Sequence, residues 1–161
     1  MNTGTMILSA FFIAICALPF ILSSRGSRKR KNTLLKSLET LADKHDAQIS
    51  IYDVGADFII GMDNIKNLVF FFKKTADNSV ENCVDLSDYK DCKILKFGKD
   101  LHATSSSYAI ERLKLDFIPK DKSAPEQQFE FYNEAVNTQL SGEIQIINTW
   151  HELIEKKLAL N

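Results

Sequence analysis

The chain has 161 residues, of which 45% are hydrophobic and 25% are charged, and its formal net charge is −1. This length suits a terminal segment and one domain with a core, and it excludes two independent domains. Residues 1–31 contain five basic side chains and no acidic one, so the remaining 130 residues carry 15 Lys and Arg against 21 Asp and Glu, a formal charge of −6. Such an acidic domain argues against nucleic acid as a partner, because phosphate backbones are bound by clustered Lys and Arg.

Residues 1–24 predict a transmembrane anchor. The run from Met6 to Leu22 is apolar, and no side chain between Asn2 and Ser24 is charged. About 20 mostly apolar residues are enough to span a bilayer as a helix. The alternative is a cleaved signal peptide, but a signal peptide carries its positive charges before the apolar region, whereas here they follow it.

Residues 25–31 form a basic juxtamembrane segment. Its charged side chains are Arg25, Arg28, Lys29, Arg30 and Lys31. Segments rich in Lys and Arg stay on the cytoplasmic side, so we expect a single-pass protein of a bacterial inner membrane, with the N-terminus outside and the following domain in the cytoplasm. The same five side chains are expected to contact anionic headgroups, each contributing about 1 kcal/mol.

Residues 32–47 predict a linking helix. Asn32 is a suitable N-cap, and apolar residues recur at the spacing of one helix face, at Leu34, Leu35, Leu38, Leu41 and Ala42. This helix either continues stiffly from the membrane or lies against the domain that follows.

Residues 48–161 predict a mainly β domain with a C-terminal helix. A period of two or a short apolar run indicates about seven strands, near residues 48–53, 57–62, 68–72, 80–86, 91–97, 112–117 and 128–132. The strand over 68–72 is apolar on both faces and should be central and covered, with Lys66, Lys73 and Lys74 as gatekeepers against aggregation. The segment 98–107 is predicted to be a polar loop.

The last predicted element is an amphipathic helix over about residues 141–158. One apolar stripe contains Ile144, Ile147, Trp150, Ile154 and Leu158. A helix of this kind needs a sheet on which to bury its stripe.

This order of elements resembles the pleckstrin-homology-like (PH-like) superfold. The resemblance covers about Gln48 to Leu158 and rests on the element order and on two stretches, Phe58-Ile-Ile-Gly-Met-Asp63 leading into Leu68–Phe72, and Trp150-His-Glu-Leu-Ile154. It implies an α+β, mainly β fold in which two antiparallel sheets form a partly open barrel and the C-terminal helix plugs one end.

Members of this superfold that bind inositol phosphates use a K-x-n-R pattern of basic residues in the first hairpin. The equivalent hairpin here contains Lys66, Lys73 and Lys74 but no arginine, and Asp57 and Asp63 lie among them. The hairpin therefore departs from the pattern that accompanies phosphoinositide binding.

The sequence indicates no catalytic, cofactor-binding or metal-binding residues. Zinc ligation by Cys83, Cys92 and His102 would lack the usual closely spaced ligand pairs. The acidic residues Asp85, Asp88 and Asp91 lack the alternation and the glycine of a calcium loop, and serines 105–107 lack a G-x-S-x-G context. In a reducing cytoplasm the cysteines are expected to be free thiols, whereas a reversed orientation would favour a Cys83–Cys92 disulfide.

Two functions remain from this reading. The first is a non-enzymatic, membrane-anchored interaction or scaffold module that binds another protein. The alternative is a membrane-surface module that interacts with lipid through the basic juxtamembrane segment. The acidic charge of the domain favours the first, because attraction to the membrane surface follows basic charge.

Overall fold

The structure is a computed structural model that describes residues 26, 28–75, 78–100, 108–121, 124–137 and 139–160. The predicted transmembrane anchor, residues 1–24, and Arg25 lie outside the described residues. Within the described part, no helix is both long enough and apolar enough to cross a membrane.

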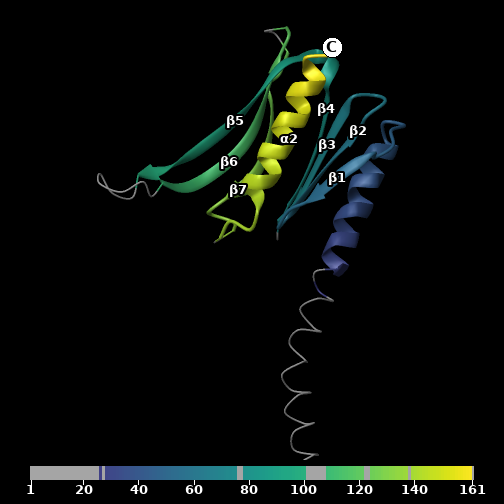
Figure 1. The fold of residues 1–161 in the computed structure, drawn as a ribbon. Helices are drawn as coiled ribbons and strands as arrows, with labels where there is room; N and C mark the ends of the chain where they lie inside the picture. Colours follow the sequence, from purple (N-terminus) through teal and green to yellow (C-terminus); the bar gives the residue numbers. More distant parts are fainter. Residues whose placement is uncertain are drawn as a thin grey trace, which may run out of the picture.

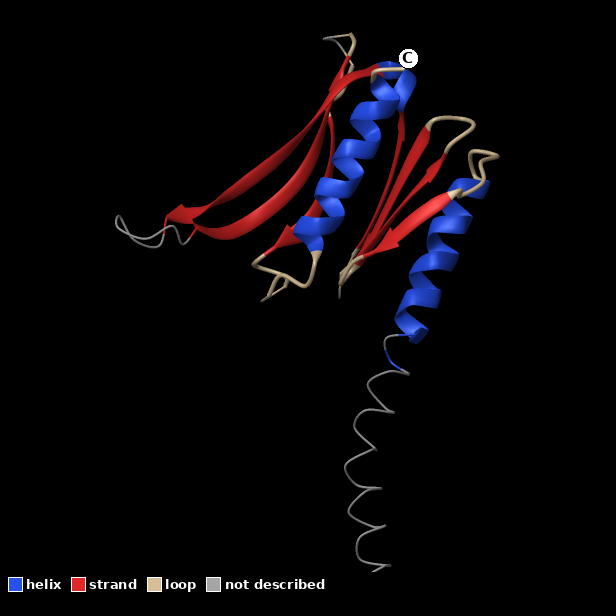
Figure 2. Ribbon diagram, viewed as in Figure 1, coloured by secondary structure: helices blue, strands red, loops and turns tan. Residues whose placement is uncertain are grey.

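The described residues form an α+β, mainly β fold, which confirms that prediction (Figures 1 and 2). One antiparallel sheet has the order β1-β2-β3-β4, and the other has the order β5-β6-β7. The first sheet contains β1 (Ile51–Val54), β2 (Phe58–Asp63), β3 (Leu68–Lys74) and β4 (Ser79–Asp85). A 3₁₀ turn, η1 (Leu86–Asp88), leads into β5 (Tyr89–Asp100), β6 (Tyr108–Pro119), β7 (Gln127–Asn133) and the C-terminal helix α2 (Glu143–Leu158).

The largest boundary difference concerns the predicted polar loop over residues 98–107. β5 continues to Asp100 and β6 begins at Tyr108, so both ends of this segment belong to a long hairpin. A register shift between Phe97 and Gly98 interrupts the strand period at this point. Residues 101–107, with the candidate serines and His102, lie outside the described residues.

The N-terminal helix covers residues 28–43 and lies against the domain, which settles the choice that the sequence left open (Figure 1). Its apolar face packs on the outer face of the first sheet, in a cluster of Leu34, Leu38, Leu41, Ala42, Ala47, Ile59, Phe70 and Phe72. Gly61 in β2 allows this close approach, because a Cβ there would lie 2.7 Å from Cδ2 of Leu38. The helix starts before Asn32, so residues 28–31 of the basic segment form its first described turn.

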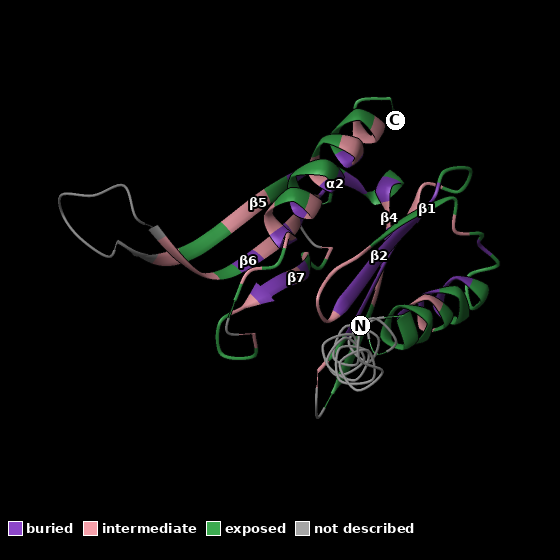
Figure 3. Ribbon diagram, turned by 60° about the horizontal axis from the view of Figure 1, so that its bottom comes forward, coloured by how far each residue is buried: buried purple, intermediate pink, exposed green. Residues whose placement is uncertain are grey.

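Both faces of β2 and β3 are therefore covered, as predicted for the strand over 68–72 (Figure 3). The inner face packs into a second cluster, between the two sheets and α2, which is rich in aromatic rings. Phe71 stacks on Phe129 at 4.9 Å between ring centroids, and Phe58 meets Phe131 edge-on at 4.8 Å. These rings join the two sheets through their shared core.

β7 and the turn after it contact the first sheet through polar side chains. Gln128 and Glu130 of β7 contact Asn82 of β4 and Lys73 of β3, and Asn137, after β7, contacts Asp57 in the β1–β2 turn. The helix α2 closes another side of the core. Its contacts reach β1 through Trp150 and β5 through His151, and Lys157 Nζ donates to the Asn64 carbonyl in the β2–β3 turn at 3.2 Å.

The β2–β3 turn is stabilised by the buried carboxylate of Asp63. Its two oxygens accept backbone hydrogen bonds from Gln48 at 2.8 Å, Ile65 at 2.8 Å and Lys66 at 3.0 Å. These hydrogen bonds hold the pKa of Asp63 below its usual 3.8. The bond from the Lys66 backbone contributes most, and those from Gln48 and Ile65 add to it. The ionised carboxylate thus links this turn to the chain entering β1.

Asp63→Asn is expected to lower the free energy of unfolding by about 2 kcal/mol at neutral pH, because the amide group presents a donor to one of these N–H groups. Because the folded pKa is lowered, the contribution of Asp63 is present above the unfolded pKa and is lost as the pH falls through the folded value. Chemical denaturation at neutral pH and at about pH 2.5 should show the difference between the two proteins shrinking in acid. A difference that stays constant would contradict this account.

Candidate functional site

The basic residues predicted to lie at the membrane surface are in the first described turn of the N-terminal helix. Arg28, Lys29, Arg30 and Lys31 are all exposed. Lys31 lies over the ring of Tyr52, with Nζ 5.9 Å from the ring centroid. The structure therefore brings these four residues together, while Arg25 lies outside the described residues.

Two of them line a pocket of about 340 Å³ between this helix and one end of the first sheet, which we call the basic pocket. Its lining consists of Gly26, Lys29, Arg30, Thr33, Leu34, Asp57 and Lys74. The lining residues from the helix are three or four positions apart, so they lie on one helix face. On the other side, the backbone N–H of Lys74 donates to the Asp57 carbonyl at 2.8 Å, which brings the end of β3 to the β1–β2 turn.

The sequence did not indicate that Lys74 belongs with the basic segment. Lys74 is more than forty positions from Lys29 and Arg30, and only the packing of the N-terminal helix on the sheet brings the three together. The spacing of Lys29, Arg30 and Thr33 on one helix face was a visible signal, but it does not reveal which strand end lies opposite.

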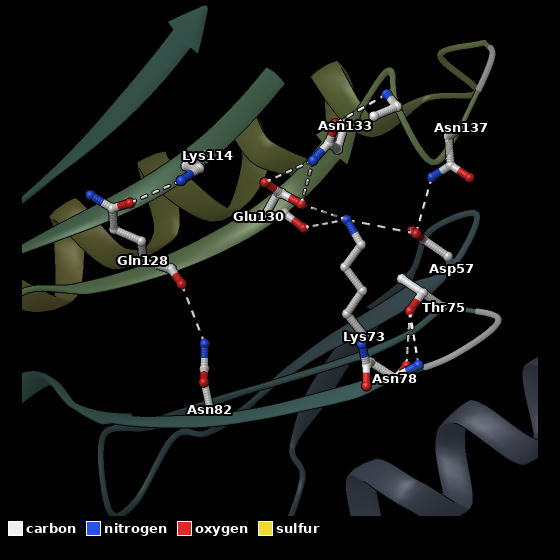
Figure 4. Close-up of polar contacts among 11 residues, drawn as sticks. Asp57, Lys73, Thr75, Asn78, Asn82, Lys114, Gln128, Glu130, Asn133 and Asn137 are labelled. Carbon is white, nitrogen blue, oxygen red and sulfur yellow. Dashed lines mark hydrogen bonds and ion pairs between the residues drawn. The ribbon is translucent and has the colours of Figure 1, made fainter. Parts of the chain in front are cut away.

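Lys73, the neighbour of Lys74, has a different environment. It is only 3% exposed, so this flanking lysine is buried in the folded domain, and its role as a gatekeeper against aggregation stays a prediction. Its Nζ lies 3.1 Å from the Glu130 carbonyl, 3.4 Å from Oε1 of Glu130 and 3.6 Å from Oδ2 of Asp57 (Figure 4). Strand alternation explains the difference, because successive side chains on β3 point to opposite faces.

The Lys73 ammonium lies at the centre of a polar network between the two sheets (Figure 4). Asn137 Nδ2 donates to Oδ2 of Asp57 at 3.0 Å, and Asn133 Nδ2 donates to Oε1 of Glu130 at 3.3 Å. Beside it, Asn82 Nδ2 donates to the Gln128 carbonyl at 3.3 Å. Lys73 and Asn82 thus donate side-chain hydrogen bonds to two backbone carbonyls at the edge of β7. In a closed barrel, a neighbouring strand would pair with these carbonyls.

The outer edge of β5 has no neighbouring strand in the described sheets. His151 of α2 contacts the Cys92 carbonyl at 2.9 Å near the start of this edge. Farther along, the hairpin extends beyond the third strand of its sheet, because β7 pairs with β6 only from Arg112 to Phe117. The side chain of Phe97, which pairs with Arg112 where β7 ends, is 43% exposed, and the Arg112 guanidinium lies 5.5 Å from its ring centroid.

Other candidate residues have structural roles. Oδ1 of Asp85 caps η1 by accepting from the Ser87 backbone at 2.9 Å, and Oδ1 of Asp91 accepts from the Cys92 backbone at 2.8 Å. The buried Glu143 accepts from the Ser141 backbone at the start of α2. No group of three His, Cys, Asp or Glu side chains suited to a metal ion occurs within the described ranges.

Cys83 and Cys92 are free thiols in separate clusters. Cys83 packs near the N-terminal helix, whereas Cys92 lies in the core between the sheets. Burial, with a smaller contribution from Asp85, raises the pKa of Cys83 to about 11, and burial likewise raises the pKa of Cys92. Both residues are therefore protonated at neutral pH and poorly suited to nucleophilic or ligating chemistry.

Comparison of the chain with protein families, with curated proteins and with solved structures finds no match.

Proposed function

We propose that this chain is a non-enzymatic, membrane-anchored module of PH-like architecture whose cytoplasmic domain binds another protein. The architecture is supported by the division into four and three antiparallel strands, followed by one helix that packs between them. The anchor is the apolar segment 1–24, and the basic residues after it favour a cytoplasmic domain. Side chains that could have served catalysis, such as Lys73, His151 and Asp85, are engaged in contacts that join elements of the fold.

The outer edge of β5 carries the proposal of protein binding. A long strand without a neighbour presents backbone N–H and C=O groups that an extended segment of a partner can pair with. The hairpin reaches beyond β7, so the end of this edge belongs to a ribbon of two strands (Figure 1). Phe97 adds a half-exposed aromatic ring, the type of side chain that contributes most at protein interfaces.

The test is copurification of the full-length protein, tagged at its C-terminus and extracted gently from its own membranes. A version that ends at Lys31 measures what the anchor alone retains. A stoichiometric protein that depends on residues 32–161 is the expected result. Recovery of the same proteins by both versions would contradict the proposal.

The position of the interface is tested by Phe97→Glu in the full-length protein. We expect recovery of the partner to fall by about tenfold or more, because loss of an aromatic anchor costs about 2 kcal/mol at an interface. Val136→Glu is the matched control, since Val136 is 49% exposed and lies beyond β7, away from this edge. Equal losses in the two variants would place the interface elsewhere.

A further inference from the structure

We propose that the basic pocket binds the phosphate of an anionic phospholipid headgroup in the membrane that anchors the chain. This proposal rests on the proposed function only for the anchor and its orientation, not for the protein partner. Two of the three cations come from the N-terminal helix, which precedes the segment that resembles PH-like proteins.

The pocket concentrates positive charge that the domain does not neutralise. Within the described part of the chain, Lys29, Arg30 and Lys74 form no ion pair. Asp57 is the acidic residue of the lining; its Oδ2 lies 3.6 Å from Lys73 Nζ and 3.0 Å from Asn137 Nδ2, and its Oδ1 is buried with no hydrogen bond to the described residues. The positive charges of Lys29, Arg30 and Lys74 therefore favour an anion in the pocket, although the domain as a whole is acidic.

The lining suits a phosphodiester attached to a glycerol. A guanidinium such as that of Arg30 can bind two phosphate oxygens at once, and the ammonium groups of Lys29 and Lys74 add point charges. A volume of about 340 Å³ is within the range of small-ligand pockets. Leu34 supplies an apolar wall against which the glycerol can lie.

The position of the pocket in the chain favours lipid over soluble phosphate. Gly26 lines it and comes two residues after Ser24, where the predicted anchor ends. Anchoring holds the pocket at headgroup level, where anionic lipids are present at a high effective concentration. Binding there would fix how the domain lies on the membrane, and with it the direction in which the β5 edge faces.

The test is native mass spectrometry of the purified full-length protein in detergent micelles supplied with phosphatidylglycerol, with phosphatidylcholine or with inorganic phosphate. We expect one retained phosphatidylglycerol per chain and much weaker retention of the other two. Arg30→Gln and Lys74→Gln should each lower the affinity for phosphatidylglycerol about fivefold, the effect of one cation near an anionic lipid. Because the protein is free of partners in this experiment, the result is independent of the protein-binding proposal.

Lys36→Gln is the matched control, because Lys36 is exposed on the same helix but does not line the pocket. Little change in this variant, beside losses in the other two, would support the pocket. Equal losses in all three would show attraction by juxtamembrane charge alone and overturn it. Equal retention of both lipids, or binding of inorganic phosphate in place of lipid, would also overturn the proposal. Circular dichroism verifies that the variants remain folded.

Discussion

Lys73→Ala is expected to lower the free energy of unfolding by about 3 kcal/mol, near the lower end for removing one member of a buried ion pair. The substitution leaves the Asp57 carboxylate and the Glu130 carbonyl without the ammonium that lies between them. It also removes the apolar stem of the lysine from the space between the sheets. The lower end applies because the Glu130 side chain is 31% exposed, so water can replace part of the lost interaction.

Two further variants separate the charge from the packing. Lys73→Met retains most of the stem and should lose about 2 kcal/mol, the contribution of hydrogen bonds to a charged group. Lys74→Ala removes the exposed neighbour on the same strand and should change stability by less than about 0.5 kcal/mol. Urea denaturation of residues 26–161 measures all three. A Lys73→Ala variant as stable as Lys74→Ala would show that the network does not hold the sheets together.

Trp150→Ala is expected to have the largest effect on stability, a loss of about 4 kcal/mol for removing a large buried aromatic side chain. Trp150 is 1% exposed, and its ring belongs to the cluster that α2 shares with both sheets. Its Nε1 donates to Oδ2 of Asp53 at 2.9 Å, which joins α2 to β1. Loss of the ring should therefore release the helix from the core.

Trp150→Phe removes the hydrogen bond to Asp53 and keeps most of the aromatic surface. It should cost more than the hydrogen bond alone, which contributes about 1 kcal/mol, because the smaller ring also leaves a cavity. Thr149→Ala, at an exposed neighbouring position of α2, is the control and should have little effect on stability. If Trp150→Ala retains cooperative unfolding and near-native stability, α2 is not required to close the core.

The proposed lipid site and the proposed protein-binding edge lie in different parts of the domain. The basic pocket lies at the start of the N-terminal helix, whereas the β5 edge belongs to the other sheet. The polar network of Lys73 and the helix α2 connect the two sheets between them. Under the two proposals, headgroup binding fixes the orientation in which the β5 edge meets a partner.

Local patterns were sufficient to predict the kinds of element and their order. The alternation of apolar and polar residues in β7 and the apolar stripe of α2 each indicated one buried face, because the side-chain period is two in a strand and 3.6 in a helix. The continuous apolar run of β3 indicated that both of its faces are covered. The hairpin ends near Gly98 were missed, because polar residues in an extension that packs little carry no signal of burial.

The chain by itself determined the charge asymmetry, the apolar N-terminal segment, the mainly β class and the faces that must be buried. The tertiary structure decided which groups from distant segments meet. Lys73 and Lys74 are adjacent and chemically identical, yet one is buried between carboxylates and the other lines the basic pocket. The two environments differ because β3 is covered by the second sheet on one face and by the N-terminal helix on the other, and such contacts depend on packing that no local pattern encodes.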